Sequence, residues 1–289
     1  MDPTPAPTRP SRPVAGTRPE PPSGAPLVVL KLGSSVLRSE ADLPAVVRAL
    51  AAERVSGRAV VGVVSAFAGA TDRLLARARR LCADAPPGPL ARLLATGETR
   101  AAATLALALE GAGVPAQLLE PGEAGLLARG APLEAEPWAL DPEPFRRAFA
   151  RARVVVLPGF YAGDAAGETV LLGRGGSDLT ALFVAARLGA AECRLVKDTG
   201  GVYQADPHRE PGARRFASLS WEAARRLGGR VVQDRALAFA WREGRDFAVA
   251  ALDGGSRTRV GPHPTRLAQT ALAISPTAET SRATSSGVV

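Results

Sequence analysis

Short, uninterrupted apolar runs alternate with longer amphipathic stretches along most of this chain, and this alternation restricts its fold more than any other feature. The apolar runs predict strands over residues 27–32, 59–64, 116–119, 154–157, 193–196 and 247–251. The amphipathic stretches predict helices over residues 43–53, 72–83, 90–110, 144–150, 178–188, 221–227 and 235–243. Runs without polar alternation are typical of strands buried on both faces of a parallel sheet. The pattern therefore predicts an α/β fold, a three-layer α/β/α sandwich with a mainly parallel central sheet.

The folded unit is expected to span residues 27–260, with a hairpin over residues 161–172 added to the central sheet. Residues 1–26 are rich in Pro and Arg, and residues 261–289 likewise show no apolar periodicity. Both compositions are typical of disordered tails. The tail after residue 260 is expected to be too short for an added domain of about 50 residues or more.

The location expected for the chain is the cytoplasm, without a membrane partner. The N-terminal tail contains no apolar segment like that of a secretion signal, and no later run is long enough to span a bilayer. Cys82 and Cys193 are the only cysteines, and they show neither a disulfide framework nor zinc-site spacing. The sequence identifies no ligands for a metal ion.

The net charge of +8 raises the question of a nucleic-acid partner. Nine arginines in residues 209–245 stand against four acidic residues. Aromatic residues make up only 4% of the chain, and no nucleic-acid recognition motif accompanies the charge. We interpret the charge as solvated helix faces close to an anionic nucleotide, and we expect no nucleic-acid partner.

Lysine is almost absent from the chain. Of the 36 lysine and arginine residues, only Lys31 and Lys197 are lysines. A lysine ammonium is a compact, strongly hydrated charge, whereas an arginine guanidinium is a broad planar fork. Lys31 lies near the end of one predicted strand and Lys197 directly follows another, and each enters a segment that contains glycine, so their retention indicates phosphoryl chemistry.

Lys31 opens the segment KLGSS at the carboxyl end of the first predicted strand. The backbone N–H groups of a turn at Gly33 are suited to hold a phosphate, while the ammonium neutralises the oxygens being transferred. A lysine before a glycine turn also occurs as a purely structural feature, so this segment alone is a weak signal.

The segment LGRGGSD, residues 172–178, precedes a predicted apolar helix. Ser177 or Asp178 is expected to cap that helix, and the glycines allow a ligand to approach the backbone. The alternative is a plain glycine loop with a capping residue. Arg174 favours a binding role, because a guanidinium between glycines can form two hydrogen bonds to a carboxylate or phosphate.

The segment KDTGGVYQADP, residues 197–207, leaves the end of a predicted central strand. Open α/β sheets bind ligands at the carboxyl ends of their strands. A simple turn has no need to combine Lys197, Asp198, Tyr203 and Asp206.

Common nucleotide-binding signatures are absent from the sequence. No glycine is followed by lysine, no G-x-G-x-x-G follows a predicted strand, and the H-R-D and D-F-G elements of protein kinases are missing. The chain therefore belongs to none of the classes that these signatures define.

Four segments, in chain order, resemble signatures of the amino-acid kinase superfamily and are most similar to aspartate kinase catalytic domains. VSAFAGATD, from residue 64, resembles V-S-A-x-x-x-x-T-D/N, and TGE, from residue 96, resembles H/S-G-E. LGRGGSDLTA, from residue 172, is similar to the aspartate kinase signature. DTGGVYQADP, from residue 198, resembles D-x-x-G-I/V-Y-x-x-D-P. The matches extend over nearly all of residues 27–260.

The resemblance implies a carbamate kinase-like fold and ATP-dependent phosphorylation of the aspartate side chain to 4-phospho-L-aspartate, with Mg2+ as cofactor. This step leads to lysine, threonine and methionine. The resemblance also implies a homo-oligomer such as a dimer, or association with another kinase subunit. The short tail after residue 260 leads us to expect no regulatory ACT domain.

The resemblance also assigns roles to individual residues. The implied catalytic residues are Lys31 and Asp178. The implied substrate-binding residues are Ser65, Thr71, Glu98, Arg174 and Ser177. The implied ATP-binding residues are Lys31, Gly33, Ser34, Gly175, Gly176, Lys197, Asp198, Tyr203, Asp206 and Arg230.

The chain departs from the aspartate kinase pattern in three places. Its first motif lacks one glycine of K-F-G-G-S/T-S and reads K-L-G-S-S, as in glutamate 5-kinase; Arg230 replaces a frequent lysine; and His208 stands where arginine commonly follows D-P. Two alternatives remain open. One is a glutamate 5-kinase-like enzyme that forms an acyl phosphate, and the other is a catalytically silent, nucleotide-binding subunit of a larger kinase assembly.

Overall fold

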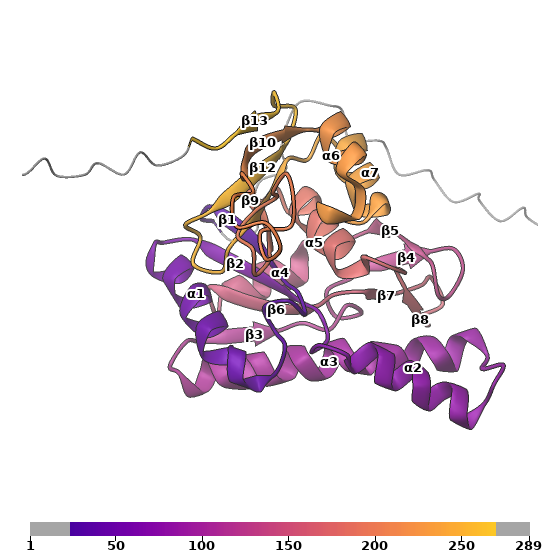
Figure 1. Cartoon of the computed structure of the whole chain (residues 1–289). Helices are drawn as coiled ribbons and strands as arrows, with labels where there is room; N and C mark the ends of the chain where they lie inside the picture. The colour runs from indigo at the N-terminus through magenta and orange to yellow at the C-terminus, as the bar shows by residue number, and fades with distance from the viewer. Residues whose placement is uncertain (1–23, 270–289) are drawn as a thin grey trace, which may run out of the picture.

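A nine-stranded sheet forms the centre of the molecule in the computed structural model, which describes residues 24–269 (Figure 1). The strand order is β13-β10-β12-β11-β9-β1-β2-β6-β3. The strands are β1 (Leu27–Leu32), β2 (Ala59–Val64), β3 (Ala116–Leu118), β6 (Val154–Pro158), β9 (Glu192–Val196), β10 (Phe216–Ser220), β11 (Phe247–Ala250), β12 (Arg257–Gly261) and β13 (Arg266–Leu267). All neighbours pair in parallel except β11 with β12 and β10 with β13, so the sheet is mainly parallel, as predicted.

Helices cover both faces of the central sheet. They are α1 (Leu43–Val55), α2 (Ala70–Leu81), α3 (Pro87–Gly111), α4 (Glu143–Phe149), α5 (Gly176–Arg187), α6 (Trp221–Leu227) and α7 (Asp234–Arg242), with short 3-10 helices η1 (Glu40–Asp42) and η2 (Gly228–Arg230). Alternate residues of β1 enter two different cores: Val29 packs with side chains of α4 to α7, and Val28 packs with side chains of α1 and α3. Burial on both faces explains the uninterrupted apolar runs and confirms the α/β/α sandwich.

The predicted hairpin exists, but it does not extend the central sheet. Strands β7 (Tyr161–Gly163) and β8 (Thr169–Leu171) pair antiparallel within a separate four-stranded sheet of order β5-β4-β7-β8. The other two strands, β4 (Leu127–Arg129) and β5 (Glu136–Ala139), were not predicted. Leu171 of β8 packs with α3 residues in a small apolar cluster, which fixes this sheet beside the main one.

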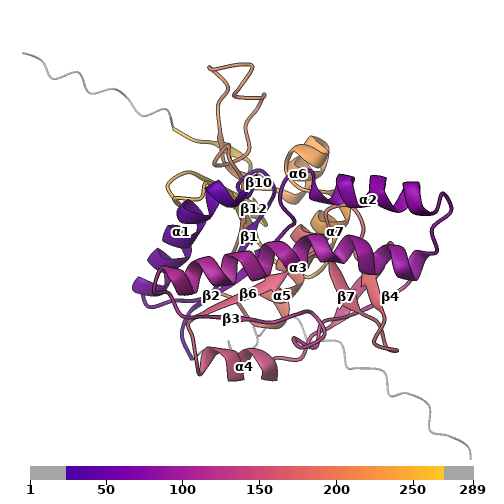
Figure 2. The same ribbon diagram turned by 90° about the horizontal axis from the view of Figure 1, so that it is seen from below.

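Helices α2 and α3 lie side by side and extend beyond the edge of the sheet (Figures 1 and 2). Prolines in the first turn of α3 suit a position where the missing N–H has no helical partner. None of the helices within residues 24–269 has the length and apolar content that crossing a bilayer requires.

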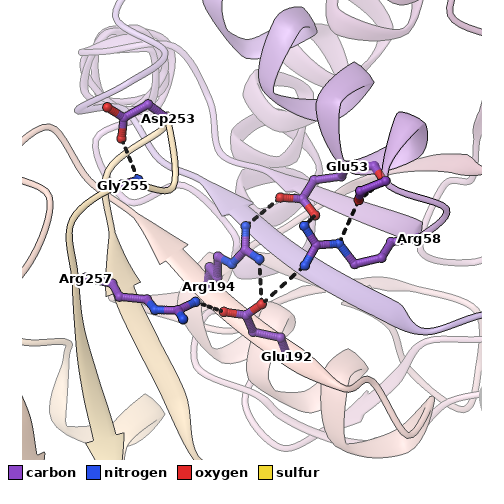
Figure 3. Close-up of polar contacts among 8 residues, drawn as sticks. Glu53, Arg58, Glu192, Arg194, Asp253, Gly255 and Arg257 are labelled. Atoms are coloured by element: carbon purple, nitrogen blue, oxygen red, sulfur yellow. Dashed lines mark hydrogen bonds and ion pairs between the residues drawn. The ribbon is translucent and has the colours of Figure 1, made fainter.

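A charged network ties α1 to strands β9 and β12 (Figure 3). The buried Arg194 of β9 donates to Glu53 of α1 at 2.6 Å and to Glu192 at 2.5 Å. Arg58 lies 2.6 Å from the second Glu53 oxygen, and Arg257 of β12 lies 3.0 Å from Glu192. The hydrogen bonds that Arg194 donates to Glu192, first, and to Glu53 hold the pKa of Arg194 above its ordinary value despite burial. The arginine thus stays charged and joins β9 to α1, and the Arg257–Glu192 pair adds β12 to the network.

The sequence predicts that the fold ends at residue 260, and strand structure continues beyond that residue. Gly261 completes β12, and Arg266 and Leu267 form β13, which pairs with β10. The remaining parts of the expected tails, residues 1–23 and 270–289, lie outside the residues that the structure describes.

Candidate functional site

A cleft of about 300 Å3 opens where β1, β2 and β6 end and α5 begins. Ten residues that the sequence singled out line it: Lys31, Ser34, Ser65, Thr71, Glu98, Arg174, Gly175, Gly176, Ser177 and Asp178. They come from three of the four family-like segments and from the KLGSS segment. These segments lie together because the carboxyl ends of parallel strands share one edge of the sheet, even when the strands are distant in sequence.

An ion pair between Lys31 and Asp178 occupies this cleft. Their Nζ and Oδ1 atoms are 2.8 Å apart, and the side chains are only 14% and 10% exposed. Asp178 lies in the first turn of α5, where the positive end of the helix dipole favours a carboxylate. The ion pair therefore holds the Lys31 ammonium group beside the N-terminus of α5.

Gly33 makes room for that ammonium without lining the cleft. A Cβ atom at position 33 would lie 2.6 Å from the Lys31 Nζ atom. Any larger residue would displace the Lys31 side chain or be displaced by it. The glycine of the KLGSS segment thus acts through Lys31.

The glycine-rich segment brings the backbone of α5 to the cleft. Gly175 is the N-cap residue with φ +75°, so the prediction that Ser177 or Asp178 caps the helix is wrong. Both residues instead lie within the first turn of the helix, and their side chains are buried. The Gly176 N–H donates to the Gly173 carbonyl at 3.0 Å, and the first i to i−4 hydrogen bond runs from Leu179 N–H to the Gly175 carbonyl at 3.0 Å. The Ser177 and Asp178 amides between them have no such helical acceptor. These amides are suited to an anion.

Glu98 of α3 places a buried carboxylate at the inner wall. Its Oε1 atom accepts a hydrogen bond from the Ala66 N–H at 3.1 Å, and its Oε2 atom has no hydrogen-bond partner among the described residues. Burial raises the pKa of Glu98 to about 7, although the Ala66 amide and the Lys31 charge act in the opposite direction. A cationic ligand group would satisfy the free oxygen.

Arg174 contributes an exposed guanidinium group to the cleft. Among residues 24–269 it forms no ion pair, so its donors are available to a ligand. Beside the Lys31–Asp178 pair, the site therefore offers an unpaired cation, the buried carboxylate of Glu98 and the hydroxyl groups of Ser65 and Thr71.

Lys197 lies close to the cleft but not in its wall. Its Nζ atom donates to the Val231 carbonyl at 2.9 Å. Burial lowers the pKa of Lys197, and Lys31 lowers it further, whereas Asp178 raises it. The charge of Lys31 therefore acts on Lys197 across the end of the sheet.

Three residues expected at the nucleotide are not in the cleft. Asp198, Tyr203 and Asp206 lie in the long connection between β9 and β10, which projects from the molecule (Figure 2). There Asp198 accepts from Thr199 N–H at 3.1 Å, and Asp206 accepts from His208 N–H at 3.0 Å. The side chain of Arg230 lies outside the described part of the chain.

Two aromatic residues of the cleft were missed by sequence reasoning. Phe67 lines its wall, and so does Phe160, whose φ of 73° is rare for a residue with a side chain. The Phe160 N–H donates to Thr180 Oγ1 at 3.2 Å, which helps to hold this conformation. The FAG and GFY sequences carry no periodic signal that marks either position.

A hydrogen-bonded triad behind the cleft was also missed. The Tyr161 hydroxyl contacts Glu120 and lies 2.7 Å from Thr99 Oγ1. Thr99 follows Glu98 on α3 and Tyr161 follows Phe160, so the triad supports two residues of the cleft. Burial, followed by the hydrogen bond to Glu120, raises the pKa of Tyr161.

Comparisons with known proteins agree with this architecture. The sequence model of the amino acid kinase family matches residues 26–250. Aspartokinase of Thermus thermophilus is 36% identical over 221 residues, which are 75% of this chain and 55% of that protein. Aspartokinase of Pseudomonas aeruginosa is 36% identical over 217 residues, 74% of this chain and 53% of that protein. The chain thus spans about half the length of these relatives.

Solved structures show the same fold. Aspartate kinase from Synechocystis superposes with a TM-score of 0.68 at 28% identity, covering 82% of this chain and 40% of that one. Carbamate kinase from Giardia lamblia reaches a TM-score of 0.58 at 12% identity, covering 83% and 100%, and is similar in fold alone. The expected carbamate kinase-like fold is confirmed. With a matching family model over most of its length, the chain belongs to the amino acid kinase family.

Proposed function

We propose that the chain transfers the γ-phosphoryl group of ATP to the side-chain carboxylate of aspartate and so forms 4-phospho-L-aspartate. One observation carries this proposal: the Lys31–Asp178 ion pair shares a cleft with the buried carboxylate of Glu98 and the free guanidinium of Arg174. The relatives named aspartokinase support the choice of aspartate.

The nucleophile of this reaction needs no general base. An aspartate side chain has a pKa of about 3.9 and is ionised at neutral pH. What the transfer requires is fixed positive charge along the phosphoryl oxygens. Lys31 and the first amides of α5 supply it, and Asp178 holds the ammonium in position.

The amino acid is oriented by groups of opposite charge. In the proposed complex the ionised Glu98 binds the ammonium group, and Arg174 binds the α-carboxylate. Ser65, Thr71 and Ser177 supply hydroxyl groups to the same cleft. A bidentate guanidinium contact with a carboxylate is strong and directional, which would aim the side-chain carboxylate at the nucleotide.

ATP is proposed to reach the cleft from the side of Lys197. Lys31, Gly33, Ser34, Gly175 and Gly176 would surround its phosphates. Asp198, Tyr203, Asp206 and Arg230 would contact the rest of the nucleotide if the β9–β10 connection folds over it.

The donor set suits a Mg2+ ion that arrives with the nucleotide. No group of three or more His, Cys, Asp or Glu side chains within residues 24–269 is arranged to hold a metal ion. Mg2+ is commonly held by one or two carboxylates together with substrate phosphates, and Asp178 is a carboxylate at this place. When bound, the ion would supply further positive charge to the phosphates.

The test is trapping of the acyl phosphate with hydroxylamine. The purified chain is incubated with ATP, Mg2+ and either aspartate or glutamate, and both the hydroxamate and ADP are measured. We expect aspartate hydroxamate and equimolar ADP, and no hydroxamate from Asp178→Asn. If glutamate gives a hydroxamate and aspartate does not, the substrate is glutamate. ATP binding without ADP release from either amino acid would identify a silent subunit.

A further inference from the structure

A second hollow, of about 650 Å3, adjoins the cleft and is larger than it. It lies between η1, α2 and α3, and Phe67 lines both the hollow and the cleft. Its other notable feature is charge. Five arginines line it against a single acidic residue, Glu40: they are Arg38, Arg73, Arg77, Arg80 and Arg100.

Most of this charge is not neutralised by the protein. Arg38 is paired with Asp42 at 2.7 Å, and Arg100 lies 3.5 Å from Glu40. Within residues 24–269, no ion pair reaches Arg73, Arg77 or Arg80. Arg73 donates only to the Ala68 carbonyl, at 3.3 Å.

The three unpaired arginines stand on one face of α2. Their spacing of four and then three residues places them one above another along the helix. Like charges at this spacing destabilise a helix, so the arrangement costs stability when no anion is present. Arg79, on the same helix, does not line the hollow, which shows that the convergence is not simply a property of an arginine-rich helix.

The floor of the hollow is apolar. Phe67, Ala70 and Leu74 line the hollow together with the arginines and contribute carbon surface. Pockets of about 300–1,000 Å3 with a few charged groups over an apolar lining are typical of small-molecule sites. Guanidinium groups bind carboxylates and phosphates through paired hydrogen bonds.

We propose that this hollow is a binding site for a small, multiply charged anion that carries at least two phosphate or carboxylate groups. The α2 arginines hold the anionic groups, and the carbon body rests on Phe67 and Leu74. The site is separate from the cleft that contains Lys31 and Asp178, and it does not depend on the identity of the phosphoryl acceptor.

The test uses isothermal titration of the purified full chain with inorganic pyrophosphate and, separately, with citrate, at constant ionic strength. Phosphate binding in the cleft near Lys31 is distinguished from binding in the hollow by the cleft variant Arg174→Ala. We expect saturable binding of at least one probe. Arg77→Glu should raise its dissociation constant about tenfold or more, because a charge-assisted contact becomes a repulsive one. The tighter probe identifies the phosphate or the carboxylate class.

Two matched variants make the result decisive. Arg79→Glu has the same charge change on the same helix and should leave the dissociation constant within about twofold. Arg174→Ala, in the cleft, should do the same. The proposal is overturned if neither probe binds, if Arg79→Glu weakens binding as much as Arg77→Glu does, or if only Arg174→Ala abolishes it. Binding of an acidic peptide but of neither probe would also overturn it. Circular dichroism confirms that each variant is folded.

Discussion

At the scale of single residues, the cleft contains charged groups that the sequence identified, but in surroundings that the sequence did not predict. Lys31 and Glu98 were marked by the resemblance, and the structure places both on one cleft with Asp178. The burial that raises the pKa of Glu98 was not predictable, because it depends on how α3 packs beside β2. The hydrogen bond from Lys197 to the Val231 carbonyl was not predictable either, because every residue has a backbone carbonyl and the sequence does not indicate which one accepts.

Replacing Lys31 by arginine tests the need for a compact cation. The space beside Gly33 is so small that a Cβ atom there would lie 2.6 Å from the lysine Nζ atom. A planar guanidinium does not fit the same position, so we expect kcat to fall about 100-fold or more. Nucleotide affinity, measured by titration, should change much less. Turnover close to that of the wild type would contradict the role given to Lys31.

The pKa of Glu98 predicts a pH-dependent stability. In the folded chain burial raises this pKa to about 7, so the protonated carboxyl is favoured there relative to the unfolded chain. Its stabilising contribution is therefore complete below about pH 4 and is lost as the pH rises through about 7. Glu98→Gln has no such ionisation.

We accordingly expect Glu98→Gln to gain stability relative to the wild type between pH 5 and pH 8, by on the order of 2 kcal/mol. Urea unfolding at several pH values measures the difference. The variant Glu136→Gln, at an exposed position in β5, is the control and should show no such trend. Parallel pH curves for Glu98→Gln and the wild type would refute the prediction.

At the scale of elements, sequence pattern was sufficient for the core and insufficient for the periphery. Each predicted strand and helix is present, with ends that differ by a few residues, because burial on both faces leaves a continuous apolar run. The missed strands lie in the small sheet or at the β10–β13 end. Strand β5 contains Pro137, which argues against a strand, and β12 alternates exposed arginines with buried Thr258 and Val260. Their pairing is decided by tertiary contacts.

The start of α5 is an element whose geometry depends on one glycine. Gly175 has φ +75°, and a Cβ atom there would lie 2.5 Å from the Gln233 Cβ atom. Gly175→Ala should therefore lower the free energy of unfolding by about 1–3 kcal/mol and disturb the first turn of the helix.

Gly111→Ala is the matched control, because nothing lies within 4 Å of the added methyl at the end of α3. It should be neutral or stabilising by up to about 1 kcal/mol. Chemical denaturation of both variants provides the comparison. An equal effect of the two substitutions would show that the backbone at Gly175 is not specially constrained.

At the scale of the whole molecule, the two faces of one sheet serve different purposes. Helices α4 to α7 and helices α1 and α3 bury separate apolar cores, so the strand ends between them remain free for the cleft. The network of Glu53, Arg194, Glu192 and Arg257 links α1 through β9 to β12, in the half of the sheet that lies beyond β9 (Figure 3). The charged network could not be predicted, because its members are scattered through the sequence.

Residues after β12 are hydrogen-bonded to β10 at the C-terminal end of the fold. Ser218 donates to the Pro264 carbonyl at 2.6 Å, and Ser220 N–H donates to Thr265 Oγ1 at 3.1 Å. Ala268 N–H donates to the Arg215 carbonyl at 2.8 Å. These contacts hold β10, whose last residue, Ser220, also caps α6. Residues 261–269 thus stabilise an element on which a helix depends.

A chain that comprises residues 24–269 should accordingly unfold in one transition at the temperature of the full chain. A chain that ends at residue 260 loses these hydrogen bonds, each worth about 1 kcal/mol, and its melting temperature should fall by roughly 5–15 °C. Calorimetry of the two shortened chains beside the full chain measures both effects. Equal melting temperatures for the two shortened chains would show that residues 261–269 do not stabilise the fold and that the fold ends at residue 260. A lower value for residues 24–269 would instead show that the terminal segments contribute to stability.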